Sequence, residues 1–363
     1  MIALTQHQKE ILHSKNGVRE IKFQYDLLDK DDIYKKTLKN IISCSIDYKS
    51  LAEIKRTANI SLKEDSDIDY LNDRIQPFML VKDKDEWLKW SLGIFMLNSP
   101  TRKENDGYIT RDIKCYDTSQ ILVQDKVTNR YFIKSGTNYI AAILDVFLSA
   151  GIIKTNIAGI NKNIITDREF PIGTSKLEII NTLLKEINYY SIVADELGYF
   201  ISKPYISPVD RDIEYTYKTD ESSIIYNGLT ETLDLFNAPN KFVVTLSNPE
   251  QKPLKSVYTN KNPDSITSTI RRGRTITEFK QVDNIADQEE LDNYTKRLAE
   301  NASNVYGHIE FETAVMPHHS YLDCLQLEHD NMSIKDKYIE TNWRMNLKEG
   351  AKMNHKIRKV VKV

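Results

Sequence analysis

The residues best suited to chemistry gather near the C-terminal end of the sequence. They are His318, His319, Asp323, Cys324 and His329. Reliable zinc motifs have paired Cys-x-x-Cys or helical His-x-x-x-His spacings, and this cluster has neither. Leu325 and Leu327 alternate with polar neighbours, as in a turn that leads into a strand. We therefore interpret the cluster as structural.

A second candidate is a pair of carboxylates on one segment. His308, Glu310 and Glu312 share one face, with Ile309 and Phe311 on the other. On a strand the two glutamates would lie roughly 6.5–7 Å apart, a separation that a glycosidase could use. Nothing nearby would raise the pKa of one carboxyl group, so we expect a solvated strand face. The rival hypothesis is a hydrolase that uses this pair, or a metal enzyme that uses His318 and His319.

A third candidate is an acidic run that resembles a calcium loop. Its carboxylates occupy loop positions one, three, five and nine, and they are Asp65, Asp67, Asp69 and Asp73. Tyr70 stands where the loop needs glycine, and Gln76 stands where it needs a bidentate glutamate. We expect an acidic turn rather than a divalent-cation site. The sequence thus predicts no catalytic, cofactor-binding or metal-binding residue, and no cofactor.

Basic side chains are concentrated in two places. One is the segment 271–274, and the other is a tail with Lys348, Lys352, Lys356, Arg358, Lys359 and Lys362. Six phosphate contacts would give a logarithmic salt slope of about −5. No stacking aromatic residues are interleaved in the tail, and the net charge of −2 disfavours a DNA-binding accessory. Lysines also protect exposed sheet edges, so we expect the tail to be an edge strand.

Composition and length limit the class of protein. With 363 residues, 40% hydrophobic and 28% charged, the chain is expected to fold into two or three domains. Its three separated cysteines predict reduced thiols in a cytosol. The longest apolar run, 139–153, contains Asp145 and is shorter than the ~20 residues that cross a bilayer. The first residues lack the apolar core of a signal peptide. We expect synthesis in, and release into, the cytoplasm without membrane insertion.

Short alternating segments dominate the first third of the chain. Strands are predicted at 19–27, 42–48, 54–62 and 78–81. The central stretch, 87–117, predicts an apolar strand at 87–97 and an alternating strand at 108–116. Turn residues at 98–100 and 105–107 separate the two. A further strand at 131–133 is expected to close this region. The short spacing between the strands predicts that the region is a barrel or a sandwich.

The middle of the chain changes to a helical period. A helix with Tyr139, Ile143 and Phe147 is expected to end at Gly151, and a second opens at Ser175. A hairpin at 190–202 follows. The last region predicts one helix at 287–302 and strands at 241–246, 308–315, 324–328 and 356–363. The predicted domains are 1–135 (possibly completed by about 207–240), 136–206 and 207–363.

Several segments in this order resemble one known family. They are Glu86 and Trp87 with 92–95, then 113–117, 136–139 leading to Gly151 and Ile152, 233–237, 263–266 with 272–274, and 287–302. This order is similar to that of the phage tail hub family, which includes the baseplate hub of contractile tails and the N-terminal part of siphophage tail-tip proteins. The chain departs from the family at Leu322, where a glycine often precedes the aspartate. We also expect no peptidase or fibre segment after Val363, so a cell-wall-cutting role is not part of what the resemblance implies.

The resemblance implies a fold and a function. The implied fold is an α+β, β-rich protein with two β-barrel-like tube domains and a smaller α+β domain inserted between them. The implied function is structural and non-enzymatic: a homotrimeric ring that joins the six-fold tail tube to the three-fold spike or tip and lets the genome pass. The implied partners are further copies of the chain, a tail tube or distal tail protein, a spike, tip or fibre protein, a tape measure protein, and DNA only as passing cargo. The implied location is the virion tail, assembled in the host cytoplasm.

Overall fold

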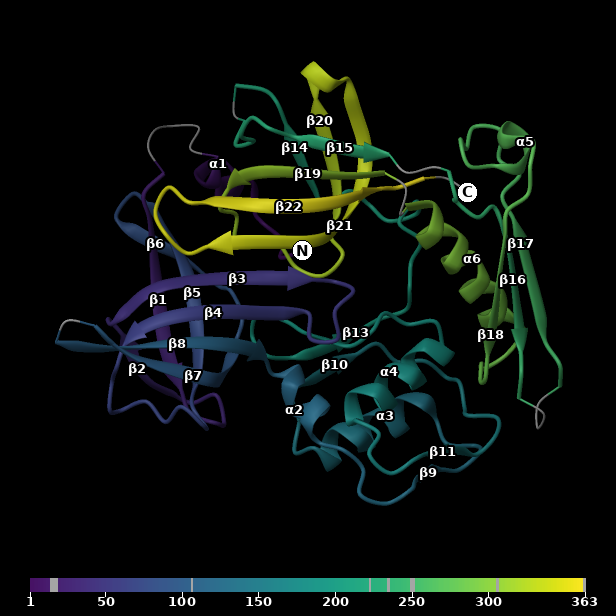
Figure 1. The fold of residues 1–363 in the computed structure, drawn as a ribbon, viewed down its shortest axis with the longest axis horizontal. Helices are drawn as coiled ribbons and strands as arrows, with labels where there is room; N and C mark the ends of the chain where they lie inside the picture. The colour runs from purple at the N-terminus through teal and green to yellow at the C-terminus, as the bar shows by residue number, and fades with distance from the viewer. Residues whose placement is uncertain are drawn as a thin grey trace.

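The computed structural model describes residues 1–13, 19–105, 107–221, 223–233, 236–248, 252–304 and 307–361. One large, strongly twisted sheet forms most of the protein, and two smaller units lie beside it (Figure 1). Its fourteen strands follow the order β15-β19-β22-β21-β3-β4-β8-β7-β5-β1-β2, with β6, β14 and β20 off this path. Within the described residues this sheet does not close on itself. The predicted β-rich class is confirmed.

The strands of the large sheet come from both ends of the chain. The first group is β1 (Ile21–Leu28), β2 (Tyr34–Leu38), β3 (Ile41–Lys49), β4 (Arg56–Lys63), β5 (Arg74–Asp83), β6 (Glu86–Ser91), β7 (Phe95–Asn105) and β8 (Tyr108–Asp117). The second group is β14 (Tyr215–Lys218), β15 (Thr230–Leu233), β19 (Gly307–Ala314), β20 (Cys324–His329), β21 (Ile334–Asn346) and β22 (Lys352–Lys359). A short 3-10 helix, Asp330–Met332, joins β20 to β21, and helix α1 (Gln6–Leu12) precedes β1.

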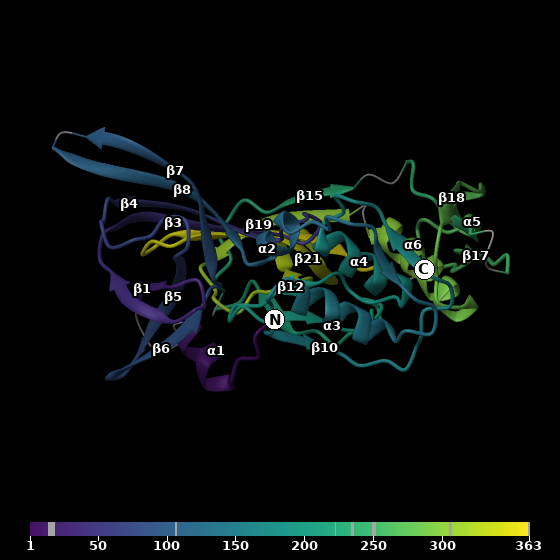
Figure 2. The ribbon, with the colours of Figure 1, turned by 90° about the horizontal axis from the view of Figure 1, so that it is seen from below.

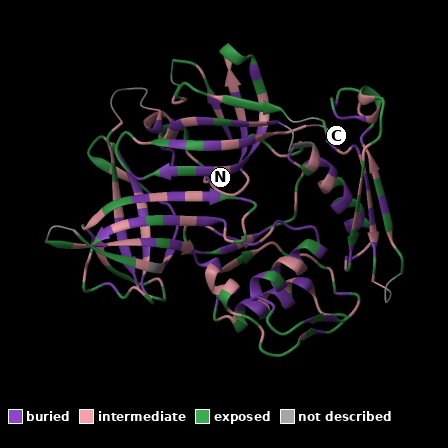
Figure 3. Cartoon of the chain, in the orientation of Figure 1, coloured by how far each residue is buried: buried purple, intermediate pink, exposed green. Residues whose placement is uncertain are grey.

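Strand β21 joins the two groups. It pairs with β22 on one side and β3 on the other, and Trp343 stacks on Tyr48 with 5.1 Å between ring centroids. Buried and more exposed residues alternate along β3 and β22, and the buried residues of both strands line the same interior (Figure 3). One buried cluster therefore contains residues from both groups, such as Ile46 and Met353. The first and last regions of the chain share a sheet and a core.

The central stretch differs from its prediction in two ways. The segment 87–97 is two strands rather than one, because the chain turns at Gly93 (φ +122°), where a Cβ would lie 2.9 Å from Cδ of Arg56. The predicted turn at 98–100 is instead a bulge within β7, between Asn98 and Thr101. The hairpin of β7 and β8 therefore extends beyond the neighbouring strands (Figure 2). Asp106, in the other predicted turn, lies outside the described residues.

The α+β unit follows the large sheet's first half. Its helices are α2 (Ser119–Gln124), α3 (Tyr139–Ser149) and α4 (Lys176–Glu186), and its strands are β9 (Tyr131–Ile133), β10 (Thr155–Ile157), β11 (Arg168–Phe170), β12 (Val193–Ala194) and β13 (Phe200–Ser202). The predicted caps are present: Ser175 accepts from the backbone of Glu178, and Gly151 is left-handed. The prediction that 131–133 closes the first region is wrong, because β9 pairs with β11 inside this unit. The division at 136 and 206 stays a prediction.

A third unit contains a small sheet and a long helix. The sheet is β16 (Lys241–Leu246), β17 (Lys255–Thr259) and β18 (Thr277–Val282), and the helices are α5 (Thr269–Arg272) and α6 (Gln288–Asn304). The predicted start of α6 is confirmed, because Asp287 accepts a hydrogen bond from the backbone of Glu290. Arg297 on α6 donates to the carbonyl of Tyr189, which ties this helix to the α+β unit. Among the described residues, no helix is both long and apolar enough to cross a bilayer.

Candidate functional site

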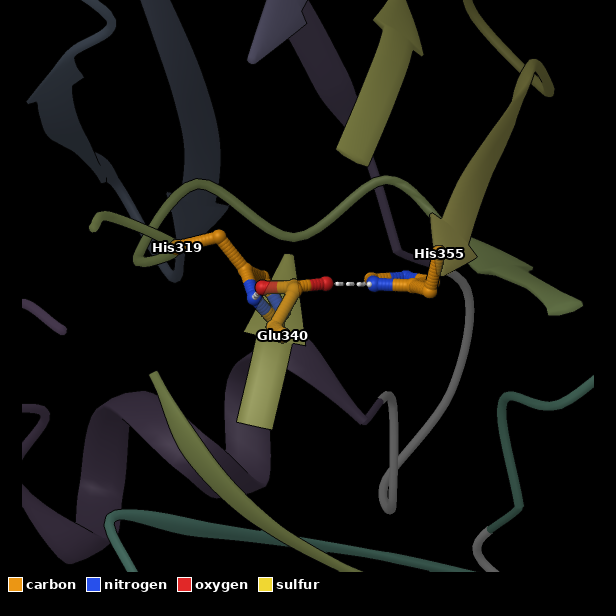
Figure 4. Close-up of side chains that lie close together, drawn as sticks. All are labelled: His319, Glu340 and His355. Carbon is orange, nitrogen blue, oxygen red and sulfur yellow. Dashed lines mark hydrogen bonds and ion pairs between the residues drawn. The ribbon is translucent and has the colours of Figure 1, made fainter. Parts of the chain in front are cut away.

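The described side chains best placed for chemistry form a buried network of His319, Glu340 and His355 (Figure 4). Glu340 lies on β21 and His355 on β22, each at a position that points into the core between apolar neighbours. His319 lies on the connection that leads to β20. All three are buried. We call this group the His–Glu–His network.

Each polar atom of the network has a partner. Nδ1 of His319 donates to one carboxylate oxygen of Glu340 at 2.5 Å, and Nδ1 of His355 donates to the other at 2.6 Å. The Nε2 atoms are hydrogen-bonded to the hydroxyls of Tyr217 (2.6 Å) and Thr313 (2.8 Å). The carboxylate therefore holds two imidazoles from different segments in fixed orientations.

Asp323 extends the network toward the start of the chain. Its carboxylate lies 3.5 Å from Nδ1 of His319 and 2.6 Å from the α-ammonium of Met1. Burial would raise the pKa of Asp323, but these two positive groups hold it well below its usual value. A buried carboxylate is tolerable only when it is paired and hydrogen-bonded in this way.

The pKa values of the two histidines bonded to Glu340 shift in opposite directions. Burial would lower the pKa of His319, but Glu340 and Asp323 outweigh it and raise the pKa to about 9. Burial lowers the pKa of His355, and Glu340 offsets only part of this. Burial would raise the pKa of Glu340, but the charges of His319 and His355 lower it. At neutral pH the network holds one imidazolium, one imidazole and one carboxylate.

A divalent metal fits this arrangement poorly. The three possible ligand atoms lie within 4.8 Å of one another, but all four ring nitrogens of His319 and His355 already have hydrogen-bond partners. A metal would have to displace the two bonds to Glu340 that orient both rings. The network is better suited to locking β21, β22 and the 319–323 connection together.

The shifted pKa values of the buried histidines should make the stability of the protein depend on pH. His318 and His355 have lowered pKa values, so the unfolded chain binds more protons below about pH 6.5 and stability falls there. His319 has a raised pKa, so its contribution is complete below about pH 6.5 and is lost as the pH rises through about 9. We expect maximum stability near pH 6.5. Urea unfolding across this range checks the prediction.

Two variants make this measurement specific. His319→Asn should reduce the decline above the maximum, and one proton limits its share to about 1.4 kcal/mol per pH unit. The α-ammonium of Met1, whose pKa Asp323 and Glu214 raise against burial, should leave a smaller decline above about pH 8. His7→Asn is the matched control, because His7 is 60% exposed and pairs with Asp83 at the surface. A parent profile that keeps rising between pH 7 and 9 would contradict the assignment.

The structure brings together only some of the residues singled out in the sequence. His319 and Asp323 join the network, whereas Cys324 begins β20 and His329 ends it. His318 lies 4.7 Å from His319 between ring centroids, but both of its buried nitrogens lack a hydrogen-bond partner. The sequence reasoning missed Glu340 and His355. Their signal was a polar residue on the apolar side of an alternating strand.

The carboxylate pair on β19 has the wrong electrostatics for a glycosidase. Glu310 pairs with Lys356 at 2.6 Å, and Glu312 pairs with Lys352 at 2.5 Å, both across to β22. These lysines lower both pKa values, whereas a general acid needs a raised one. Ile309 on the other face is buried, as predicted. The pair acts as a ladder of cross-strand ion pairs.

Two lysines pair with carboxylates of the predicted acidic turn. The ammonium of Lys36 lies 2.8 Å from Asp65 and 2.9 Å from Asp67, and that of Lys35 lies 2.7 Å from Asp73. These lysines belong to β2, next to the turn. They supply the positive charge that a calcium ion would otherwise provide. The turn is ion-paired to the sheet.

The basic segments also have internal partners. Arg272 donates to the carbonyls of Ala238 and Phe236, so its guanidinium holds a loop of the small unit. Lys359 pairs with Asp336 on the neighbouring strand. The prediction that the tail is an edge strand is wrong, because β22 lies between β19 and β21. Lys362 lies outside the described residues.

Known proteins resemble this chain in their three-dimensional structure, whereas the comparisons of sequence found no match. No protein-family model matches the chain, and no curated protein matches it. A tail protein from Neisseria meningitidis MC58 has a similar structure, with a TM-score of 0.66 at 10% identity over 93% of this chain and 96% of that one. A 43 kDa tail protein of prophage MuSo2 from Shewanella oneidensis gives a TM-score of 0.63 at 11% identity over 93% and 98%.

A third solved structure agrees with these two. The prophage tail protein gp18 from Listeria monocytogenes EGD-e gives a TM-score of 0.58 at 11% identity, over 92% of this chain and 94% of that one. The chain thus has the fold of phage tail proteins. At the level of the fold, the predicted resemblance to phage tail proteins is confirmed.

Proposed function

We propose that the chain is a structural tail hub protein of a phage or phage-like particle. In this proposal three copies form a ring that joins the six-fold tail tube to the three-fold spike or tip, and the genome passes through its bore. The observation that carries the proposal is the likeness to a phage tail protein over 93% of this chain and 96% of that one.

The physical character of the chain supports a scaffold. Its buried charged network joins strands rather than opening onto a cleft, and its carboxylate pair is neutralised by lysines. A cyclic ring needs two different surfaces on each copy, and permanent interfaces commonly bury more than ~2,000 Å². Large apolar side chains are exposed for such contacts, among them Ile33, Leu71, Ile153, Ile172 and Phe236.

The proposal includes the finer features that the resemblance implies. Two barrel-like tube domains would be completed by neighbouring copies, with residues 136–206 as the inserted α+β domain. Partners would be a tail tube or distal tail protein, a spike, tip or fibre protein, and a tape measure protein. The protein would be assembled in the host cytoplasm and reside in the virion tail, with no enzymatic role.

Light scattering on the purified protein tests the ring. The expected mass is three times the 42.1 kDa of one chain, at micromolar concentration and ordinary salt. A single copy at every concentration, both alone and mixed with tail tube and spike proteins of the same particle, would contradict the proposal.

A further inference from the structure

A second feature of the molecule is a pocket that the structural role does not use. It has a volume of about 780 Å³ and lies between the β3–β4 connection, the outer face of β21 and β22, and helix α6. Hairpin residue Tyr190 of the α+β unit completes it. Pockets of this size at the junction of several units are where small molecules usually bind.

Strand alternation separates this pocket from the His–Glu–His network. Glu340 points into the core, whereas its neighbours Ile339 and Thr341 point to the opposite face and line the pocket. Arg358 lies outward on β22 in the same way, because Ile357 is buried in the core. The pocket is thus a distinct site on the other side of the sheet.

Lys55 is a buried cation in the wall of this pocket. Only 7% of its surface is exposed, and its ammonium donates to the carbonyl of Ala52 at 3.1 Å. Burial lowers the pKa of Lys55, and the carboxylates of Asp117 and Glu53 offset only part of this. In the described part of the chain, no carboxylate forms an ion pair with Lys55. A buried ammonium that lacks an anion is costly.

Two further donors face the same space without an acidic partner. Burial lowers the pKa of Arg358, and among the described residues no carboxylate pairs with its guanidinium. Ser50 is 3% exposed, and its hydroxyl has no hydrogen-bond partner. A buried hydroxyl without a partner usually marks a missing water or ligand. Ammonium, guanidinium and hydroxyl are the donor set that binds an oxyanion.

The remaining wall is aromatic and cationic. Tyr190 and Tyr205 pack with 5.2 Å between ring centroids, and the guanidinium of Arg297 lies 4.3 Å from the centre of Tyr205. Arg211 also lines the pocket but already pairs with Glu214. Two carboxylates line the pocket as well, exposed Glu53 and half-buried Glu278. Among the described lining residues, the cations that pair with no carboxylate are therefore Lys55, Arg297 and Arg358.

We propose that this pocket binds a small oxyanion, a phosphate or a carboxylate group, held by Lys55, Arg358 and Ser50. The bound anion completes the charge compensation that the carboxylates of Asp117 and Glu53 give Lys55 only in part. The inference does not depend on the tail role, because it rests on the donors of one chain. Its failure would leave the proposed ring untouched.

Isothermal titration calorimetry at low ionic strength tests the site, with inorganic phosphate and succinate as probes. One ion is expected to bind per chain. Binding of phosphate alone, of succinate alone, or of both supports the site and tells which oxyanion it accepts. Lys55→Gln and Arg358→Gln should each weaken binding about 10- to 100-fold, as expected for a charge-assisted hydrogen bond.

Ser50→Ala separates binding from folding. It should weaken binding while the thermal midpoint without ligand stays the same or rises, because an unsatisfied hydroxyl is removed. Lys261→Gln and Arg271→Gln are matched controls, since both cations are exposed and lie outside the pocket. The site is refuted if neither probe binds at millimolar concentration, or if the pocket variants bind as tightly as the parent.

Discussion

Replacing Glu340 by alanine is expected to lower the free energy of unfolding by about 3–5 kcal/mol, because it removes one partner of a buried charge network. The imidazolium of His319 would lose its 2.5 Å bond, and His355 would lose its 2.6 Å bond. Neither ring can reach water, since both are buried. Urea unfolding followed by tryptophan fluorescence measures the loss.

The matched control for this variant is Glu312→Ala. Glu312 also bridges two strands, through Lys352, but the lysine side chain is 50% exposed. Exposed pairs contribute about 0–1 kcal/mol, so this variant should be close to the parent. Equal effects of the two variants would show that the buried network is not what joins β21, β22 and the 319–323 connection.

Phe147→Ala is expected to cost about 3–5 kcal/mol, through lost burial and the cavity that remains. Phe147 is fully buried on α3 and packs against Phe200 with 5.2 Å between ring centroids. The loss should be local, because this ring belongs to the core of the α+β unit and not to that of the large sheet. Hydrogen exchange should therefore speed up most in α3, α4 and β13.

The next residue along α3 is a natural control. Leu148 is 60% exposed, so Leu148→Ala should change stability by less than about 0.5 kcal/mol. Faster exchange across the large sheet in Phe147→Ala, to the same extent as in α3, would contradict a separate core for the α+β unit.

Local chemistry in the sequence predicted many of the elements. The caps at Ser175 and Asp287 located helix starts, because a side chain that satisfies backbone donors acts within one turn. Alternation located β1, β3, β4, β8 and β19 for the same local reason. The order of segments, read as a resemblance, predicted a fold that the solved tail proteins share.

Long-range pairing was the part that local patterns did not reveal. Residues 131–133 do form a strand, but its partner is β11, far along the chain. The C-terminal strand was expected at an edge, yet β19 and β21 flank it. In each case the strand was visible, and its neighbours depended on which distant segment folds back beside it.

The buried network was missed for a related reason. His319 was visible as part of a polar cluster, whereas Glu340 and His355 stood alone within apolar strands. Their contact requires β21 and β22 to pair and to present the same face. Sequence spacing carries no information on this. Polar residues at core positions of two strands were the available hint.

In the proposed function, copies of this chain assemble into a closed ring. Electron microscopy of the purified protein tests it most directly, through two-dimensional class averages of single particles. We expect end-on views with three-fold symmetry around an open centre. Averages that show only a lone, compact chain without symmetry, in samples that also contain the tail tube protein, would contradict it.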